Sequence, residues 1–276
     1  MTGWYADIDP GDTEEAAAAV RDGTAETPQE WPRLAVESGA VDSEGEYYDA
    51  LHEATCAAAR TAVRERERAD DQQLVHAIRA VDDCARTANE LAERVTEWGH
   101  SRYPEDDATG IDYARDLAER SPEDPMAERL VDLAGTVVEL DERAEALRET
   151  IERTMPAVAP NLSSMAGPLL GARLIALSGG LADLAKSTSG TVQVLGAEDA
   201  LFAHLRGSAP SPKHGIIYTH EYVRGTAPDN RGSAARALAG KLTIAARIDH
   251  YSGDLRPEIE RELDERIATI RSRGEQ

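Results

Sequence analysis

Two long stretches of the chain carry apolar residues at the alternating three- and four-residue spacing of an amphipathic helix. In the first stretch this stripe runs from Leu74 to Val95, and Asp70 with Gln73 ahead of it fits a capping box. Gly99 follows as a stop signal. The pattern predicts a helix of about 26 residues, roughly 40 Å long at 1.5 Å per residue.

The second stretch begins with Asp124 at an N-cap position and a proline directly after it, a combination typical of helix starts. Its apolar residues keep a heptad seam from Met126 to Ile151, and Pro156 is expected to end the helix. Similar lengths and a connection of about 25 residues predict an antiparallel coiled-coil hairpin over residues 66–155. The alternative is a helical bundle within one domain, which fits two narrow apolar stripes less well.

The heptad seam presents more apolar surface than one antiparallel partner covers, and a large apolar surface is unfavourable in water. We therefore expect the hairpin to mediate formation of a homodimer. The seam residues expected at this contact are Leu133, Val137, Leu140 and Leu147.

The segments that flank the hairpin differ in character. Residues 1–65 are acidic and interrupted by Gly and Pro, with a possible small core around Trp4, Tyr5 and Trp31. Helical patterns in this part cover residues 14–21 and 43–64. The charged tract at residues 64–71 (RERERADD) is interpreted as a solvated helix face or linker.

Residues 156–252 are rich in Ala, Leu and Gly, which favours a helical fold with close packing. Short helical patterns cover residues 165–177, 181–186, 197–205 and 234–248. Residues 215–223 (GIIYTHEYV) have the local composition of a strand. Residues 253–276 include a final amphipathic helix at 257–273, so the fold class is mainly α.

Charge is distributed unevenly along the chain. The net charge is -22, but residues 156–247 hold nine basic and five acidic residues, a net of +4. All three lysines, Lys186, Lys213 and Lys241, lie in that stretch. The acidic excess and the use of Arg in place of Lys suggest adaptation to high salt. Contact with phosphate would explain the basic stretch, and chance is the alternative.

A search for catalytic or metal-binding patterns gives no candidate. Cys56 and Cys84 lack CxxC spacing, and His214 and His220 lie six residues apart, which is poor spacing for metal ligands. The sequence has no P-loop, nucleophile elbow or dinucleotide-binding glycine pattern. We therefore expect no cofactor, no metal and no enzymatic activity. No signal peptide or membrane span is evident, which favours the cytoplasm.

Six separated blocks of sequence stand out in the C-terminal half of the chain, and two more lie upstream. The blocks are 159–176 (APNLSSMAGPLLGARLIA), 181–186 (LADLAK), 192–202 (VQVLGAEDALF), 212–218 (PKHGIIY), 231–236 (RGSAAR) and 239–249 (AGKLTIAARID), with 89–98 (NELAERVTEW) and 102–105 (RYPE) before them. In order and spacing they resemble the Nop domain of archaeal box C/D ribonucleoproteins. The resemblance covers residues 70–252.

The resemblance implies an all-helical Nop domain after a coiled-coil hairpin, with a small N-terminal α/β domain before it. It also implies that residues 215–223 form an irregular segment and not the strand that their local composition suggests. It implies an RNA-binding scaffold that supports guide-directed 2′-O-methylation. The partners implied are box C/D guide RNA, a ribosomal-type protein that binds kink-turn RNA, the methyltransferase fibrillarin and a second copy of the chain. Residues 1–65 would carry fibrillarin, through Trp4, Tyr5, Trp31 and their neighbours, although this segment is shorter than the family's domain.

We expect the RNA- and partner-binding residues to fall in the blocks that carry the resemblance. They are Gln193, Gly196, Ala197, Glu198, Lys213, His214, Arg236 and Lys241. Two positions that are basic in the family are Asp199 and Ala203 here, which puts their RNA contacts in doubt. Two other functions remain open, a coiled-coil adaptor that binds only proteins and an RNA-modifying enzyme. The missing nucleotide-binding turn argues against the enzyme.

Overall fold

The structure is a computed structural model that describes residues 3–5, 12–24, 27 and 29–272. The chain forms two compact units, residues 1–69 and residues 70–276. None of the helices in the described ranges is both long enough and apolar enough to cross a membrane.

The N-terminal unit contains α1 (Thr13–Asp22), α2 (Trp31–Glu37) and α3 (Glu44–Arg68). Asp12 and Ser43 begin α1 and α3 by accepting hydrogen bonds from backbone N–H groups of the first turn. Buried Tyr5 and Tyr47 form the core of this unit, with Trp4 and Trp31 packed against them.

The α/β architecture expected for this unit is not confirmed, because its described residues form helices and no strand. The alanines of α1 and α3 explain the helical result, since alanine has the highest helix propensity. Residues 6–11 lie outside the described part of the chain.

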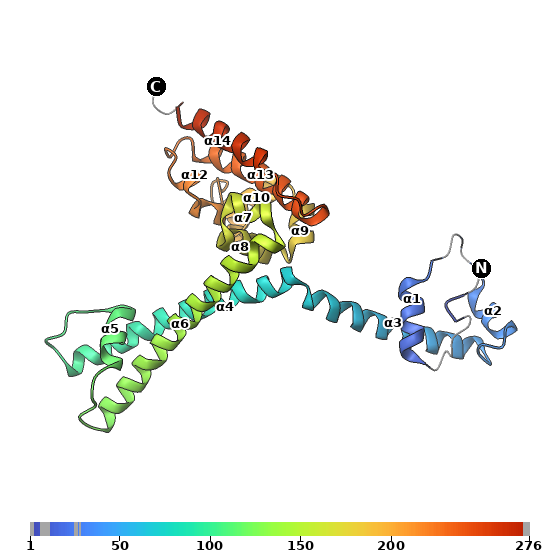
Figure 1. The fold of residues 1–276 in the computed structure, drawn as a ribbon, viewed down its shortest axis with the longest axis horizontal. Coiled ribbons are helices and arrows are strands. Elements are labelled where there is room, and N and C mark those ends of the chain that lie inside the picture. Colours follow the sequence, from blue (N-terminus) through green and yellow to red (C-terminus); the bar gives the residue numbers. More distant parts are fainter. Residues whose placement is uncertain (1–2, 6–11, 25–26, 28, 273–276) are drawn as a thin grey trace. The chain divides into compact units, whose positions relative to one another are not determined.

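In the second unit, α4 (Asp70–Arg102) and α6 (Pro125–Val158) lie side by side and run in opposite directions (Figure 1). The stripe predicted from the sequence lies between them, because Ile78, Val81 and Val137 are almost completely buried. A shorter helix, α5 (Gly110–Ala118), covers the far end of the pair, and its Tyr113 and Leu117 join the core there.

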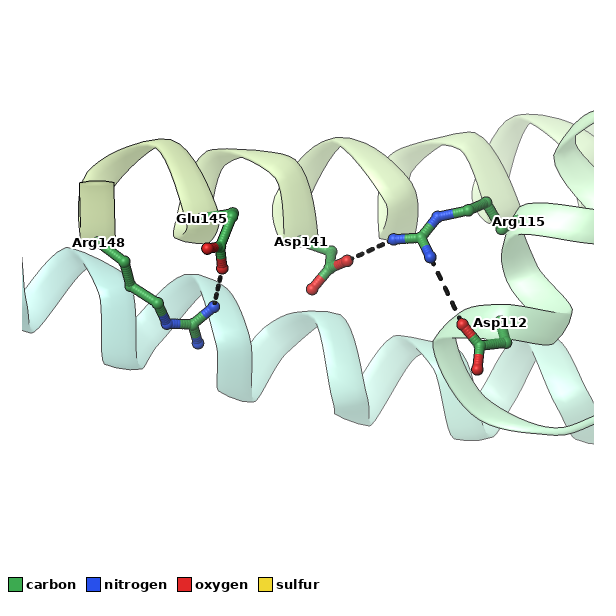
Figure 2. Close-up of polar contacts among 5 residues, drawn as sticks. All are labelled: Asp112, Arg115, Asp141, Glu145 and Arg148. Carbon is green, nitrogen blue, oxygen red and sulfur yellow. Dashed lines mark hydrogen bonds and ion pairs between the residues drawn. The ribbon is translucent and has the colours of Figure 1, made fainter. Parts of the chain in front are cut away.

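Charged side chains tie α5 to the outer surface of α6, as Figure 2 shows. The guanidinium of Arg115 lies 2.6 Å from the carboxylate of Asp141 on α6 and 3.4 Å from that of Asp112 on its own helix. A second pair on α6 joins Arg148 and Glu145 at 3.0 Å. Because such surface pairs contribute at most about 1 kcal/mol each, the apolar core and not these pairs holds the hairpin together.

The prediction that Pro156 ends the second long helix is wrong. Helix α6 continues to Val158, and the buried Met155 lies just before the proline. A proline removes one backbone hydrogen bond from a helix interior, and this loss is tolerated close to a helix end.

The rest of the second unit consists of short helices around one long helix. These elements are α7 (Pro160–Ala166), α8 (Pro168–Ser178), α9 (Leu181–Lys186), α10 (Ser189–Val194), α11 (Glu198–Leu205), η1 (Ile216–Thr219), α12 (Glu221–Arg224), α13 (Arg231–Tyr251) and α14 (Pro257–Ser272). They share one hydrophobic core, which continues into the base of the hairpin through Leu74, Ile78, Ile151 and Met155.

Two local expectations for this region need correction. The helical patch at residues 165–177 is divided between α7 and α8, because Gly167 adopts a positive φ of 76° and Pro168 starts a new helix. Residues 215–223 form η1 and α12 and not a strand. Within this segment, only the backbone N–H groups of Gly215 and Ile216 form hydrogen bonds with the backbone of a neighbouring segment. Two such bonds are too few to form a strand.

A buried carboxylate joins α7, α13 and the segment that leads into α14. Asp249 accepts hydrogen bonds from the backbone N–H groups of Asn161 and Leu162, both at 2.9 Å, and from the Asn161 amide at 2.6 Å. The Asn161 side chain also bonds to the backbone of Asp254 and Arg256 at 2.8 Å. The start of α7 and the approach to α14 are therefore fixed by the same pair of side chains.

His220 caps α12 in its neutral form. Its Nδ1 accepts a hydrogen bond from the Tyr222 backbone N–H at 3.1 Å, and its Nε2 lies 3.0 Å from the Met165 carbonyl oxygen, to which it donates. Burial is the main cause that lowers the pKa of His220 below its usual value of 6.5. A second proton would have to occupy Nδ1 and would remove the cap.

This arrangement predicts a pH-dependent stability of the second unit. Because the folded-state pKa is lowered, the unfolded chain takes up the proton first, so stability is complete above about pH 6.5 and decreases as the pH falls toward the folded-state pKa. Urea unfolding followed by circular dichroism between pH 7.5 and 5.5 measures this loss. A His220→Asn variant, which can still cap but does not titrate, should show a smaller decrease over the same range. Equal decreases in the two proteins would contradict the assignment.

Candidate functional site

Residues 213–216 are attached to the end of α10 by three hydrogen bonds. The Gln193 side-chain amide donates to the Lys213 carbonyl oxygen at 2.7 Å. The Gly215 and Ile216 N–H groups donate to the carbonyl oxygens of Gln193 and Leu195 at 2.8 and 2.7 Å. The backbone is so close here that a Cβ at residue 215 would lie 1.9 Å from the Leu195 oxygen. Only glycine fits this position.

The next residues form a cluster of aromatic and cationic side chains. The His214 imidazole stacks on the Tyr218 ring, with 4.6 Å between ring centres and 19° between planes. The Arg231 guanidinium carbon lies 5.5 Å from the centre of the same tyrosine ring. Burial, followed by the charges of Arg231 and Lys213, lowers the pKa of His214. His214 is therefore neutral near pH 7, and its ring is available for stacking and hydrogen bonding.

Lys213 extends this cluster along α13. Carbon atoms of its side chain lie 3.9 Å from the position that a Cβ on Gly232 would occupy. Arg236 lies one helical turn after Gly232, so it projects from the same face of α13. Lys213 and Arg236 are both exposed. Residues distant in sequence thus bring three cations and two rings together at the start of α13, and this group (Lys213, His214, Tyr218, Arg231 and Arg236) is called the α13 face below.

The glycine turn before α11 lies against the same segment. Gly196 has a positive φ of 78°, and a Cβ on it would lie 3.3 Å from Ile216. The Glu198 carboxylate accepts a hydrogen bond from the Gly196 N–H at 2.8 Å, so it holds the turn locally. Gly196, Ala197 and Glu198 therefore lie near the α13 face.

Lys241 does not join the other predicted binding residues. Its ammonium forms an ion pair with Glu262 of α14, and this contact lowers the pKa of the glutamate. Lys241 follows Arg236 by five positions, which places the two side chains about 140° apart around the helix axis. The structure therefore separates Lys241 from the α13 face.

The residues expected at a dimer contact lie mostly inside the chain. Val137 is fully buried, whereas Leu133 and Leu140 are half-buried against the core that includes α5, and Leu147 packs at the base of the hairpin. Met126, at the start of the same seam, is 56% exposed. The seam thus serves chiefly to join α4 to α6.

Tyr218 was not among the site residues predicted from the sequence. No simple spacing rule signals it, because His214 lies before η1 and the two rings meet through the irregular backbone at Gly215. No group of three or more metal-ligating side chains occurs within the described ranges.

Comparison with known proteins agrees with this architecture. A sequence model of the Nop family, described as "snoRNA binding domain, fibrillarin", matches residues 116–270, more than half of the 276 residues. An uncharacterized NOP5 family protein of Methanocaldococcus jannaschii is 32% identical over an alignment of 275 positions, which covers 87% of this chain and 66% of that protein. Nucleolar protein 58 of Homo sapiens is 33% identical, with 74% of this chain and 46% of that protein covered.

A third relative, nucleolar protein 58 of Yarrowia lipolytica, is 35% identical over 66% of this chain and 42% of its own length. The chain thus spans about two thirds or less of the curated relatives it matches. A chain in the crystal structure of a fibrillarin/Nop5p complex has a TM-score of 0.54 and 23% identity, covering 94% of this chain and 92% of that one, which supports the fold. With more than half of its length matched by the family's sequence model, the chain belongs to the Nop family.

Proposed function

We propose that the chain is a non-catalytic scaffold of a box C/D small ribonucleoprotein that supports guide-directed 2′-O-methylation of RNA in the cytoplasm. The observation that carries this proposal is the α13 face, where three cations and two rings are exposed or half-buried in a chain that is otherwise strongly acidic. Phosphate attracts such cations, and unpaired bases stack on such rings. The family's description as an snoRNA-binding domain supports the same conclusion.

The binding target we propose is a kink-turn RNA already bound by its ribosomal-type protein. A net charge of +4 over residues 156–247 can neutralise few phosphates, so charge attraction to bare RNA is weak and easily screened. Affinity must then come from the shape of a joint protein and RNA surface, because RNA helices are recognised by geometry. Apolar contacts on such a surface are not screened by salt.

Reversing two cations of the α13 face tests this function. The ternary complex consists of the chain, the kink-turn RNA and the ribosomal-type protein. Lys213→Glu combined with Arg236→Glu should weaken this complex by on the order of 100-fold, because each hydrogen bond to a charged group contributes about 1.5–3 kcal/mol. Lys241→Glu is the matched control, since Lys241 lies against α14, and it should have a much smaller effect. Gel-shift titration with kink-turn RNA, with and without its protein, gives the affinities.

The ternary complex of the unmodified chain should persist in molar potassium chloride. Tight binding to the bare RNA, or dissociation as the salt rises, would show that charge attraction dominates. Equal losses for the double variant and for Lys241→Glu would count against the α13 face. An absence of any bound RNA after native purification would favour the alternative function, a protein-binding adaptor.

We propose that fibrillarin docks on the N-terminal unit. Of the aromatic residues expected to bind it, Tyr5 is buried in the unit's core, and Trp4 and Trp31 pack against that core, which favours a different docking surface. A groove of about 390 Å³ between α1 and α3 offers one, and its lining includes the small Ala18 and Ala58 and the charged Arg21 and Glu65. Small side chains on two adjacent helices allow close approach of a partner's helix.

A large side chain in this groove should prevent the docking. Ala18→Arg, at an exposed position of α1, should reduce co-purification with fibrillarin at least about tenfold and leave RNA binding unchanged. Ala59→Arg is the control, because Ala59 is exposed on α3 but does not line the groove. If both variants retain fibrillarin equally well, docking occurs elsewhere.

We also propose that the chain forms a homodimer through the exposed end of the hairpin seam. Burial of a methionine side chain contributes about 1.5–3 kcal/mol. Met126→Glu should therefore weaken the dimer at least about tenfold in sedimentation equilibrium, with an unchanged circular dichroism spectrum. Val63→Glu alters an equally exposed apolar residue outside the hairpin and should have no effect. A monomeric unmodified protein at tens of micromolar would refute this proposal.

A further inference from the structure

Gln193 forms hydrogen bonds with the two residues that flank His214, namely Lys213 and Gly215. Its side-chain amide donates to the Lys213 carbonyl oxygen at 2.7 Å, and its backbone carbonyl accepts from the Gly215 N–H at 2.8 Å. The side-chain amide and the backbone carbonyl of Gln193 therefore both contact residues that lie 20 to 22 positions later in the sequence. The sequence predicts this residue as an RNA contact, but one of its two side-chain N–H donors is already used inside the protein.

The contact continues at the next residues. The Ile216 N–H donates to the Leu195 carbonyl oxygen at 2.7 Å, and the close approach at Gly215 excludes any side chain there. The segment 213–216 is thus attached to the end of α10 by three hydrogen bonds. Its other side meets α13, because the Lys213 side chain lies along Gly232.

The attachment determines where the groups of the α13 face project. Lys213 lies directly before His214, so fixing the Lys213 carbonyl limits rotation of the peptide group between them. His214 can then remain stacked on Tyr218 while the carbon chain of Lys213 lies beside Gly232 of α13. A loop fixed in its bound conformation binds more tightly, because less conformational entropy is lost on association.

We propose that Gln193 is a positioning residue, which holds the Lys213–His214 loop ready for the protein–RNA surface and does not itself recognise RNA. This inference rests on the proposed function for its effect on affinity. Its effect on the loop is independent of any RNA. A direct contact with RNA, through the remaining lone pairs of the Gln193 side-chain oxygen, is the competing role.

The first experiment uses the full chain without RNA. Gln193→Met keeps the length of the side chain but cannot donate a hydrogen bond. Amide hydrogen exchange over residues 208–218 should be roughly three- to tenfold faster in this variant, as expected for the loss of one hydrogen bond, with an unchanged melting temperature. Ser211→Ala, an exposed change in the same loop, should leave the exchange unchanged. Unchanged exchange in Gln193→Met would overturn the positioning role.

The second experiment measures ternary-complex affinity for Gln193→Met, for Lys213→Ala and for the double variant. Gln193→Met alone should weaken binding by roughly three- to tenfold. If Gln193 acts through the loop, the double variant should lose less than the product of the two single losses. Fully multiplicative losses would overturn the proposal in favour of direct RNA contact. Failure of the unmodified chain to form the complex would refute the proposed function, while the exchange measurement would still decide the role of Gln193.

Discussion

The buried carboxylate of Asp249 is the interaction on which the C-terminal half of the chain depends. A charged group removed from water is costly unless its oxygens accept hydrogen bonds, and three N–H donors from Asn161 and Leu162 meet that requirement. The bonds hold the end of α13 against the start of α7. Because Asn161 also bonds to the backbone on either side of Leu255, the direction of α14 follows from the same contact. The apolar face of α14 then closes the core beside α13.

The hairpin and the C-terminal helices share that core, so the hairpin base is fixed against the domain that carries the α13 face. Polar contacts reinforce this junction, where Asp71 of α4 accepts from the N–H of Leu181 at 2.9 Å. Arg173 of α8 and Asp82 of α4 form an ion pair at 2.6 Å. A partner bound at the hairpin and one bound at α13 would therefore be held in a defined relation within residues 70–276.

The long helices could be predicted from the sequence, because an apolar stripe repeated over many turns has few alternative structures. Helices α4, α6 and α14 begin within a residue or two of the positions expected. Short helices such as α5 and α10 were not predicted, since helices of this length are stabilised mainly by tertiary packing. The composition of residues 215–223 was misleading for a similar reason, because a strand also depends on contacts distant in sequence. This composition suits a strand, but the chain offers it a pairing segment of only two hydrogen bonds.

The site was predictable in its residue types but not in its arrangement. A basic stretch and a family resemblance were sufficient to select Lys213, His214 and Arg236, which the fold brings together. They could not distinguish Arg236 from Lys241 on one helix, because the direction of a side chain depends on how that helix packs. Nor could they show that the partner of Gln193 is a backbone carbonyl 20 residues away. With so few cations available, the affinity proposed for this surface would depend on the placement of each one, so the residues that fix the loop would matter as much as those that carry charge.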